Sequence, residues 1–421
     1  MDIIVNGINP NDIPTNISDL PIALPASKSI CNRVLTIIAQ TDGGGDTTNV
    51  SDCDDTNAII NAITMHQKGE EYINVGAAGT AMRFMTAFLA LRTKSTVTID
   101  GSARMRKRPI KELVDVLCQL GAKIEYAGDS DSCPPLRIYR APMQGGTVSI
   151  NGSISSQYIS ALMMIAPGLS DGLTINITGG LVSRPYVEMT AAIMRDFGAE
   201  VLCTDNQITI KQGDYQSRTY SVENDWSAAS YWYEIRSLIP NVNLRLASLH
   251  KNSTQGDSKV AEIFKLFGVE TEYTKEGVLL TYHPETVAKR IDIDLKNQPD
   301  LAQTIVVAAC LKGIPFKISG LSTLRIKETD RIAALISQLA KLGYIVRETE
   351  DATLESDSVR HPVDEAPSIE TFDDHRMAMA FAPASIVVPG ITIEDAEVVS
   401  KSYPKFWDHL RLFGFRFSEL E

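Results

Sequence analysis

The sequence predicts an α/β (α+β) protein in two or three domains, assembled from about six repeats of roughly 70 residues. The chain has 421 residues, too many for one ordinary core, and about 150 residues per domain suggests two or three domains. Helical patterns that end in a large apolar residue and glycine recur along it. Strand-like alternation that leads through a turn into a helix recurs with them.

The helix ends set the repeat length. Five of them are marked by Gly121, Gly198, Gly268, Gly343 and Gly414, at steps of 77, 70, 75 and 71 residues. Glycine just past a helix is the usual left-handed stop. An earlier helical stretch, residues 28–39, runs into Gly43–Gly45 and adds a unit. Each unit has room for four strands and two helices, so subdomains repeat here rather than the short modules of a solenoid.

The loops that lead into the helices carry arginine. Strand patterns at residues 96–99, 173–177 and 316–318 each precede a turn and a helix expected near Pro109, after Pro185 and near Asp330. Helix N-termini expose free N–H groups and the positive end of the helix dipole. Cations repeated at several such ends therefore predict a shared anion site. The arginines are Arg104, Arg106 and Arg108, then Arg184, then Arg325 and Arg331.

Composition excludes several functional classes. The 52 acidic residues outnumber 40 basic ones, for a net charge of −12, which disfavours a nucleic-acid or anionic-membrane partner but permits a locally basic pocket. No apolar run approaches the roughly 18–20 residues of a membrane helix, and no Lys or Arg precedes Lys28, so a basic signal-peptide start is absent. We expect a cytoplasmic protein whose six cysteines are reduced and mostly buried.

Several segments of the first half join a turn to a helix and offer hydroxyl, amide or cationic groups at the helix start. Residues 24–33 lack the spacing of a Walker loop, and the two glycines of residues 76–83 let a backbone approach a phosphate or carboxylate. Each segment taken alone also fits an ordinary helix cap or tight turn. The candidate residues are Lys28, Ser29 and Arg33; Gly79 and Arg83; Ser155, Ser156 and Gln157; and Ser183.

Charged groups mark the second half. Glu328 lies among Lys327, Arg325 and Arg331. It could act as a base or a charge stabiliser, or it could simply form ordinary ion pairs on a helix surface. Asp373 or Asp374 can cap a helix that has His375 and Arg376 at its start, too few ligands for a metal site. Asp300 precedes an apolar helix, where a lone Asp is usually an N-cap, and Lys401 precedes another helix.

Together these motifs resemble the 3-phosphoshikimate 1-carboxyvinyltransferase (EPSP synthase) family. They occur in the family's order and span residues 27–404, nearly the whole chain. The resemblance implies an enolpyruvyl transferase-like fold of six βαβαββ units in two pseudo-threefold domains. The lower domain would be residues 1–26 with 227–421, and the upper domain residues 27–226. The active site would lie in the cleft between them, which closes over the ligands.

The resemblance also implies the reaction and its residues. The enolpyruvyl group of phosphoenolpyruvate would pass to the 5-hydroxyl of shikimate 3-phosphate through a tetrahedral intermediate, with release of phosphate, in the shikimate pathway to chorismate and aromatic amino acids. The implied catalytic residues are Asp300, Glu328 and Lys28. Shikimate 3-phosphate would contact Lys28, Ser29, Arg33, Ser155, Ser156, Gln157, Ser183, Asp300 and Lys327. Phosphoenolpyruvate would contact Lys28, Gly79, Arg108, Gln157, Arg331, His375, Arg376 and Lys401.

This chemistry needs a base at the hydroxyl, an acid at the methylene carbon and fixed cations for the anionic groups. The resemblance implies no metal, no organic cofactor and a monomer without nucleic-acid or membrane partners.

One alternative is the related UDP-N-acetylglucosamine 1-carboxyvinyltransferase family. Its usual cysteine is missing from the loop at residues 101–108, and Cys118 lies ten residues further on. Another is a non-catalytic phosphosugar-binding protein of the same fold.

Overall fold

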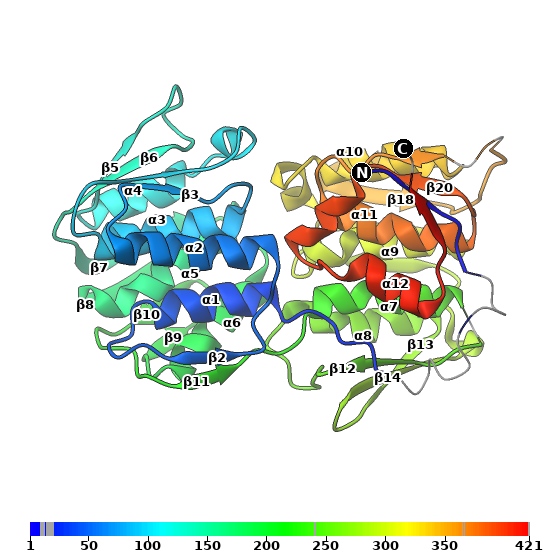
Figure 1. Ribbon diagram of the computed structural model, residues 1–421, viewed down its shortest axis with the longest axis horizontal. Coiled ribbons are helices and arrows are strands. Elements are labelled where there is room, and N and C mark those ends of the chain that lie inside the picture. The colour runs from blue at the N-terminus through cyan, green and yellow to red at the C-terminus, as the bar shows by residue number, and fades with distance from the viewer. Residues whose placement is uncertain (9–12, 14–20, 240, 364, 366, 420–421) are drawn as a thin grey trace. The chain divides into compact units, whose positions relative to one another are not determined.

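The chain divides into two compact units in a computed structural model that describes residues 1–8, 13, 21–239, 241–363, 365 and 367–419. Unit 1 comprises Met1–Pro25 and Glu223–Glu421, and unit 2 comprises Ala26–Val222. Both termini belong to unit 1 (Figure 1). None of the helices in the described part of the chain combines the length and apolarity that crossing a membrane requires.

Helices and strands alternate through unit 2, in agreement with the predicted α/β class. The helix expected near Pro109 begins two residues later, and the one expected after Pro185 begins one residue before that proline. The elements are α1 (Lys28–Ile38), β2 (Asp46–Thr48), α2 (Asp54–Lys68), β3 (Tyr72–Asn74), α3 (Gly79–Arg92), β4 (Val97–Asp100), α4 (Lys111–Gln119), β5 (Lys123–Tyr126), β6 (Leu136–Tyr139), β7 (Gln144–Asn151), α5 (Ser156–Ile165), β8 (Ser170–Thr178), α6 (Arg184–Asp196), β9 (Val201–Cys203), β10 (Gln207–Ile210) and β11 (Thr219–Ser221).

Unit 1 repeats this alternation of helices and strands. Its strands and α-helices are β1 (Ile3–Val5), α7 (Trp226–Leu238), β12 (Leu244–Ala247), α8 (Val260–Ile263), β13 (Val269–Tyr273), β14 (Gly277–Tyr282), β15 (Ile291–Asp294), α9 (Ala302–Leu311), β16 (Phe316–Ser319), α10 (Arg331–Lys341), β17 (Arg347–Thr349), β18 (Thr353–Ser356), β19 (Ser368–Ile369), α11 (His375–Phe381), β20 (Ile391–Ile393), α12 (Phe406–Phe413) and β21 (Phe417–Glu419). The 3-10 helices used below are η5 (Gly256–Lys259), η8 (Pro299–Leu301) and η12 (Ala396–Lys401).

The sheets show the repeat expected from the sequence. The described residues form six sheets, and three of them share one strand order: β3-β4-β6-β5, β7-β8-β10-β9 and β15-β16-β18-β17. In each, the first two strands are parallel and the other two pair antiparallel. The sheet β19-β20-β1-β21 has the same pattern, with β1 from the start of the chain taking the place of the fourth strand (Figure 1).

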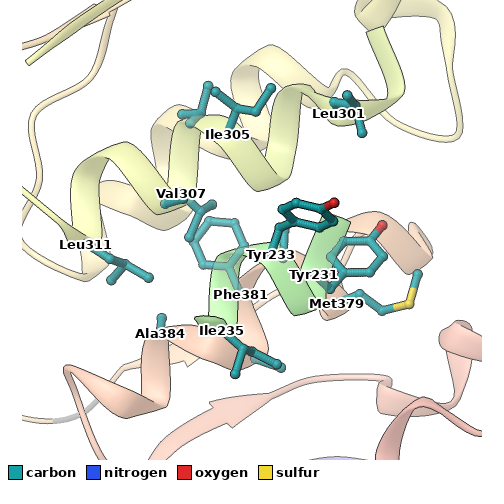
Figure 2. Packing of buried hydrophobic residues seen from close by; sticks show 14 of the residues in the cluster. Tyr231, Tyr233, Ile235, Leu301, Ile305, Val307, Leu311, Met379, Phe381 and Ala384 are labelled. Carbon is teal, nitrogen blue, oxygen red and sulfur yellow. The ribbon is translucent and has the colours of Figure 1, made fainter. Parts of the chain in front are cut away.

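Each unit has a core of nearly apolar helices. All residues of α9 and α11 are buried, as are most residues of α3, α5 and α7. A helix that is apolar on every side is stable only when other elements surround it. Figure 2 shows this packing in unit 1, where Val307 of α9 lies beside Phe381 of α11, and Tyr231 and Ile235 of α7 belong to the same buried cluster.

The predicted helix stops are confirmed. Gly121, Gly198, Gly268, Gly343 and Gly414 all have positive φ, between 87° and 109°. The outer helices that end there bury one face only; α4, for example, buries Leu113, Val114, Val116 and Leu117. Local sequence therefore places these helix ends, because a residue with a side chain is strained at such φ values.

All six cysteines lie in described positions, and none forms a disulfide. Cys31, Cys53, Cys133 and Cys310 are buried, so the prediction that most of the thiols are buried is confirmed. The exceptions are Cys118, which is exposed, and Cys203, which is partly so.

Candidate active site

The predicted site residues mark the starts of the core helices. In unit 2, Lys28 begins α1, Gly79 begins α3 and Ser155 caps α5. In unit 1, Asp300 lies in η8 immediately before α9, and Asp374 is the N-cap of α11. Polar groups are favoured at these ends because the N–H groups in the first turn of a helix have no partner within the helix. The loop that precedes each helix leaves room for such groups.

Asp300 is surrounded by three cations in unit 1. Its Oδ1 lies 3.2 Å from Arg331 Nη1 and 3.6 Å from Lys327 Nζ, and its Oδ2 lies 3.1 Å from Arg376 Nη2. Arg376 Nη1 also donates to the Asp300 backbone carbonyl. The expectation that this aspartate serves as the N-cap is wrong, since Leu301 occupies that position of α9. Asp300 is instead an ion-paired carboxyl group.

Arg331 links the acidic groups of this cluster. Its Nε lies 2.6 Å from Asp374 Oδ2, and its Nη2 donates to Glu328 Oε2 at 2.9 Å. Burial alone would lower the pKa of this guanidinium, but Asp374, Glu328 and Asp300 together raise it above the ordinary value. Arg331 is therefore a permanent cation whose side chain is only 2% exposed.

Glu328 bridges two cations in the same cluster. Its Oε1 lies 3.3 Å from the ammonium of Lys401, the last residue of η12, and its Oε2 pairs with Arg331. The two chain segments are about seventy residues apart in the sequence, so only the folded chain brings Lys401 to this carboxylate. The ion pair agrees with the sequence-based interpretation that Glu328 lies among cations.

His375 and Arg376 open α11, as predicted. Asp374 caps the helix by accepting from the Arg376 backbone N–H at 3.0 Å, and His375 Nδ1 lies 3.7 Å from Asp374 Oδ1. Arg376 Nη1 also reaches the Tyr231 hydroxyl at 3.5 Å, and burial raises the pKa of Tyr231 to about 12. A neutral hydroxyl and a carboxylate thus hold the Arg376 guanidinium in place.

The unit 1 cluster holds four cations, Lys327, Arg331, Arg376 and Lys401, and three carboxylates, Asp300, Glu328 and Asp374. Cations in slight excess suit the binding of small anions. Carboxylates among them can accept or return protons next to a bound anion. The arrangement can therefore both bind anionic substrates and carry out acid–base chemistry.

Lys28 has a buried partner in unit 2. Its Nζ lies 3.2 Å from Asp55 Oδ2, and the Asp55 side chain is 5% exposed. Asp55 lies in the first turn of α2, where a carboxylate also suits the helix dipole. The pair fixes the position of the Lys28 ammonium at the start of α1.

Arg33 is buried between helices of unit 2. Its guanidinium donates to Thr190 Oγ1 at 2.7 Å, to Ser160 Oγ at 3.2 Å and to the carbonyl oxygens of Ser29 and Tyr186. Burial lowers the pKa of Arg33 to about 10. Arg33 thus joins α1 to α5 and α6 and holds the Ser29 and Tyr186 backbones together.

Gly79 and Arg108 are in close contact. A methyl group on Gly79 would lie 2.7 Å from Arg108 Nη1, so only glycine lets this guanidinium approach the start of α3. Arg108 Nε is buried without a hydrogen-bond acceptor among the residues described. Beside them, Gln157 Nε2 donates to Thr80 Oγ1 at 3.2 Å and ties α5 to α3.

The predicted serines divide between capping and loop positions. Ser155 Oγ accepts from the Gln157 backbone N–H at 3.2 Å, the geometry of an N-cap. Ser156 is the first residue of α5 and is buried. Ser183 precedes α6 in the left-handed conformation, with φ of 54°. A non-glycine residue in this region is under backbone strain.

Sequence reasoning missed two partners that complete these sites. Asp55 was not proposed, although Asp54 and Asp55 together form the acidic first turn of α2. Asp374 was proposed only as a cap, whereas it also holds Arg331 from 43 positions away. No local sequence pattern predicts a pairing across such a separation.

Across the described residues, no three His, Cys, Asp or Glu side chains gather closely enough to hold a metal ion.

Comparison with known proteins identifies the family of this chain. The family profile described as EPSP synthase (3-phosphoshikimate 1-carboxyvinyltransferase) matches residues 64–410. A protein of Bacteroides fragilis named 3-phosphoshikimate 1-carboxyvinyltransferase is 49% identical over 395 residues, covering 94% of this chain and 95% of its own. A protein of the same name from Methanospirillum hungatei is 36% identical over 413 residues, covering 92% and 94%.

Solved structures support the fold. The EPSP synthase of Acinetobacter baumannii superposes with a TM-score of 0.79 at 20% identity, covering 99% of this chain and 100% of that one. The enolpyruvyl transferase NikO of Streptomyces tendae gives 0.73 at 12% identity, covering 99% and 98%. The family profile and the two named relatives match most of this chain. The chain therefore belongs to the EPSP synthase family.

Proposed function

We propose that this protein transfers the enolpyruvyl group of phosphoenolpyruvate to the 5-hydroxyl of shikimate 3-phosphate and releases phosphate, the reaction for which its relatives are named. It is a transferase of the EPSP synthase family. The observation that carries the proposal is the cluster of Lys327, Arg331, Arg376 and Lys401 around Asp300 and Glu328. Both substrates are anions, and the reaction moves protons beside them.

Asp300 is the proposed base for the attacking hydroxyl. The cations around it favour the ionised carboxylate, which is the form that accepts a proton. Those cations also weaken it as a base while the site is empty. When the phosphate and carboxylate groups of the substrates bind Arg331, Arg376 and Lys327, the positive charge acting on Asp300 falls and its proton affinity rises.

Glu328 is the proposed proton carrier at the methylene carbon. Adding the alcohol to the double bond of phosphoenolpyruvate delivers a proton to that carbon, and eliminating phosphate removes one. A single carboxyl group can do both if it starts protonated and is ionised between the two steps. Arg331 and Lys401, which already flank Glu328, would stabilise its ionised form during that interval.

The remaining residues would bind the two substrates. For shikimate 3-phosphate we propose Lys28, Ser29, Arg33, Ser155, Ser156, Gln157, Ser183, Asp300 and Lys327. For phosphoenolpyruvate we propose Lys28, Gly79, Arg108, Gln157, Arg331, His375, Arg376 and Lys401. In support, Ser155, Gly79 and Lys28 lie at the starts of three core helices, where N–H groups and the helix dipole favour anions. We further infer that the protein acts as a cytoplasmic monomer without a cofactor.

Phosphate release tests the proposal. The protein is incubated with phosphoenolpyruvate and either shikimate 3-phosphate or UDP-N-acetylglucosamine. We expect release with the first acceptor only. Release with the UDP-sugar alone would favour the alternative transferase, and binding of both shikimate-pathway substrates without release would favour a non-catalytic protein.

A matched pair of variants tests the role of Asp300. We expect Asp300→Asn to lower the turnover number by roughly 10²–10⁴-fold, the usual contribution of a general base. Asp408→Asn makes the same chemical change on the exposed face of α12 and should be neutral. Near-normal turnover in Asp300→Asn would remove Asp300 from the proposed role.

A further inference from the structure

A second aspartate, Asp257, is buried behind the proposed base. It lies in η5, is 3% exposed and accepts a hydrogen bond at Oδ2 from the Ser227 hydroxyl. Its Oδ1 is also buried and finds no hydrogen-bond donor in the portion of the chain that the structure describes. Leaving a buried carboxylate oxygen unpaired is costly, so this side chain calls for a functional explanation.

Helix α7 places Asp257 next to the cluster of unit 1. Helix α7 packs against both η5 and η8, the 3-10 helices that carry Asp257 and Asp300. Ser227, in the first turn of α7, holds Asp257. Tyr231, one turn later on the same side of the helix, meets Arg376. Arg376 in turn pairs with Asp300.

The charges around Asp257 couple it to Asp300. Burial, followed by the negative charge of Asp300, raises the pKa of the Asp257 carboxyl to about 7. The positive charge of Arg376 and the Ser227 hydroxyl act in the opposite direction, and Asp225, the N-cap of α7, raises the pKa slightly. These are the charged and hydrogen-bonding groups that act on Asp257 from α7, η8 and α11.

We propose that Asp257 is a positioning residue that acts through Arg376 and Asp300, and that its negative charge keeps Asp300 basic enough to take the substrate proton. Three cations oppose proton uptake by Asp300. The Asp257 carboxylate interacts with the charge of Arg376 and offsets part of that positive charge. The inference rests on the proposed function, since it assigns Asp300 as the base.

The pH dependence of kcat/KM for phosphate release separates this role from a purely structural one. In the wild type we expect an acidic limb near neutral pH that belongs to the Asp257–Asp300 pair rather than to either group. Asp257→Asn removes the charge, so the limb should move down by at least one pH unit and the plateau should fall about tenfold. The KM of each substrate should change by less than about threefold. An unchanged limb in a folded Asp257→Asn protein would overturn the proposal.

Ser227→Ala provides a second variant with the opposite prediction. The Ser227 hydroxyl stabilises the ionised form of Asp257, so without it Asp257 ionises at higher pH and the limb should move upward. Loss of packing in either variant would not shift the two limbs in opposite directions. Shifts in the same direction, or none, would overturn the proposal even if Asp257→Asn were unstable. Asp408→Asn is again the control.

A measurement without substrates separates this inference from the proposed function. Urea unfolding of the wild type, Asp257→Asn, Asp300→Asn and the double variant is followed at pH 6 and pH 8.5. Compared with the wild type, Asp257→Asn should raise the unfolding midpoint more at pH 8.5 than at pH 6. In the Asp300→Asn background this difference between the two pH values should be smaller. Equal shifts in both backgrounds would overturn the coupling. A wild type that couples these residues but releases no phosphate would instead refute the proposed function.

Discussion

Glu234 is an unpaired acid in the core of unit 1. It lies in α7 with no solvent exposure, and neither carboxyl oxygen has a hydrogen-bond partner within the described ranges. Burial raises the pKa of Glu234 well above its ordinary value, and no other cause contributes. The folded protein therefore carries this group as the neutral acid, whereas the unfolded chain ionises it above about pH 4.3. The perturbation that tests this is Glu234→Gln, which has nearly the same shape and no titration.

The size of the effect follows from proton linkage. A raised pKa contributes stability that is fully present below the unfolded value and is lost as the pH rises toward the folded value. In that window the folded state holds one proton that the unfolded chain has released. The wild type should therefore lose about 1.4 kcal/mol of unfolding free energy per pH unit relative to Glu234→Gln. Between pH 5 and pH 6 the two proteins should diverge by about that amount.

Urea unfolding followed by tryptophan fluorescence is the suitable assay. All three tryptophans, Trp226, Trp232 and Trp407, belong to unit 1, and two of them lie on α7 with Glu234. Glu272→Gln, on the exposed end of β13, is the matched control and should follow the wild type. Parallel stability curves for the wild type and Glu234→Gln between pH 5 and pH 7 would refute the reasoning, because they would mean that Glu234 titrates normally in the folded state.

Three further predictions follow from single contacts. Gly79→Ala places a methyl group 2.7 Å from Arg108 Nη1, so we expect the KM for phosphoenolpyruvate to rise about tenfold or more while that for shikimate 3-phosphate changes little; equal changes in steady-state assays would contradict this. Asp374→Ala leaves buried Arg331 without its closest partner and should lower the unfolding free energy of unit 1 by about 3–5 kcal/mol. A loss of less than about 1 kcal/mol in urea unfolding would contradict this. Ser155→Ala removes the N-cap of α5 and should cost about 1 kcal/mol, visible by circular dichroism but not by the fluorescence of the unit 1 tryptophans.

Local patterns in the sequence predicted the repeats and most helix ends. Glycine stops such as Gly121 and Gly343 depend on the φ value of a single residue. Caps such as Ser155 depend on a side chain and an N–H group two residues away. Information of this range is present in the sequence itself, so these features were identified correctly.

Pairings over long separations were not predictable in the same way. An aspartate before an apolar helix suggested an N-cap, but Asp300 pairs with Lys327, Arg331 and Arg376 instead. The cap position that Asp300 leaves is filled by Leu301. The choice between a cap and an ion pair depends on what lies across the helix start. Lys327 and Arg331 come from elsewhere in the same repeat, and Arg376 comes from the next repeat, 76 positions away.

The sequence by itself determined the fold class, the repeat, the family and the charged residues placed at helix starts, because capping, periodicity and motif order are properties of neighbouring residues. Only the tertiary structure decided which charges meet. It joined Glu328 to Lys401 and Arg331 to Asp374, and it buried Asp257 and Glu234 without full hydrogen bonding. The physical reason is that burial and ion pairing depend on the packing of helices dozens of residues apart, which sets the local dielectric and the distance between charges.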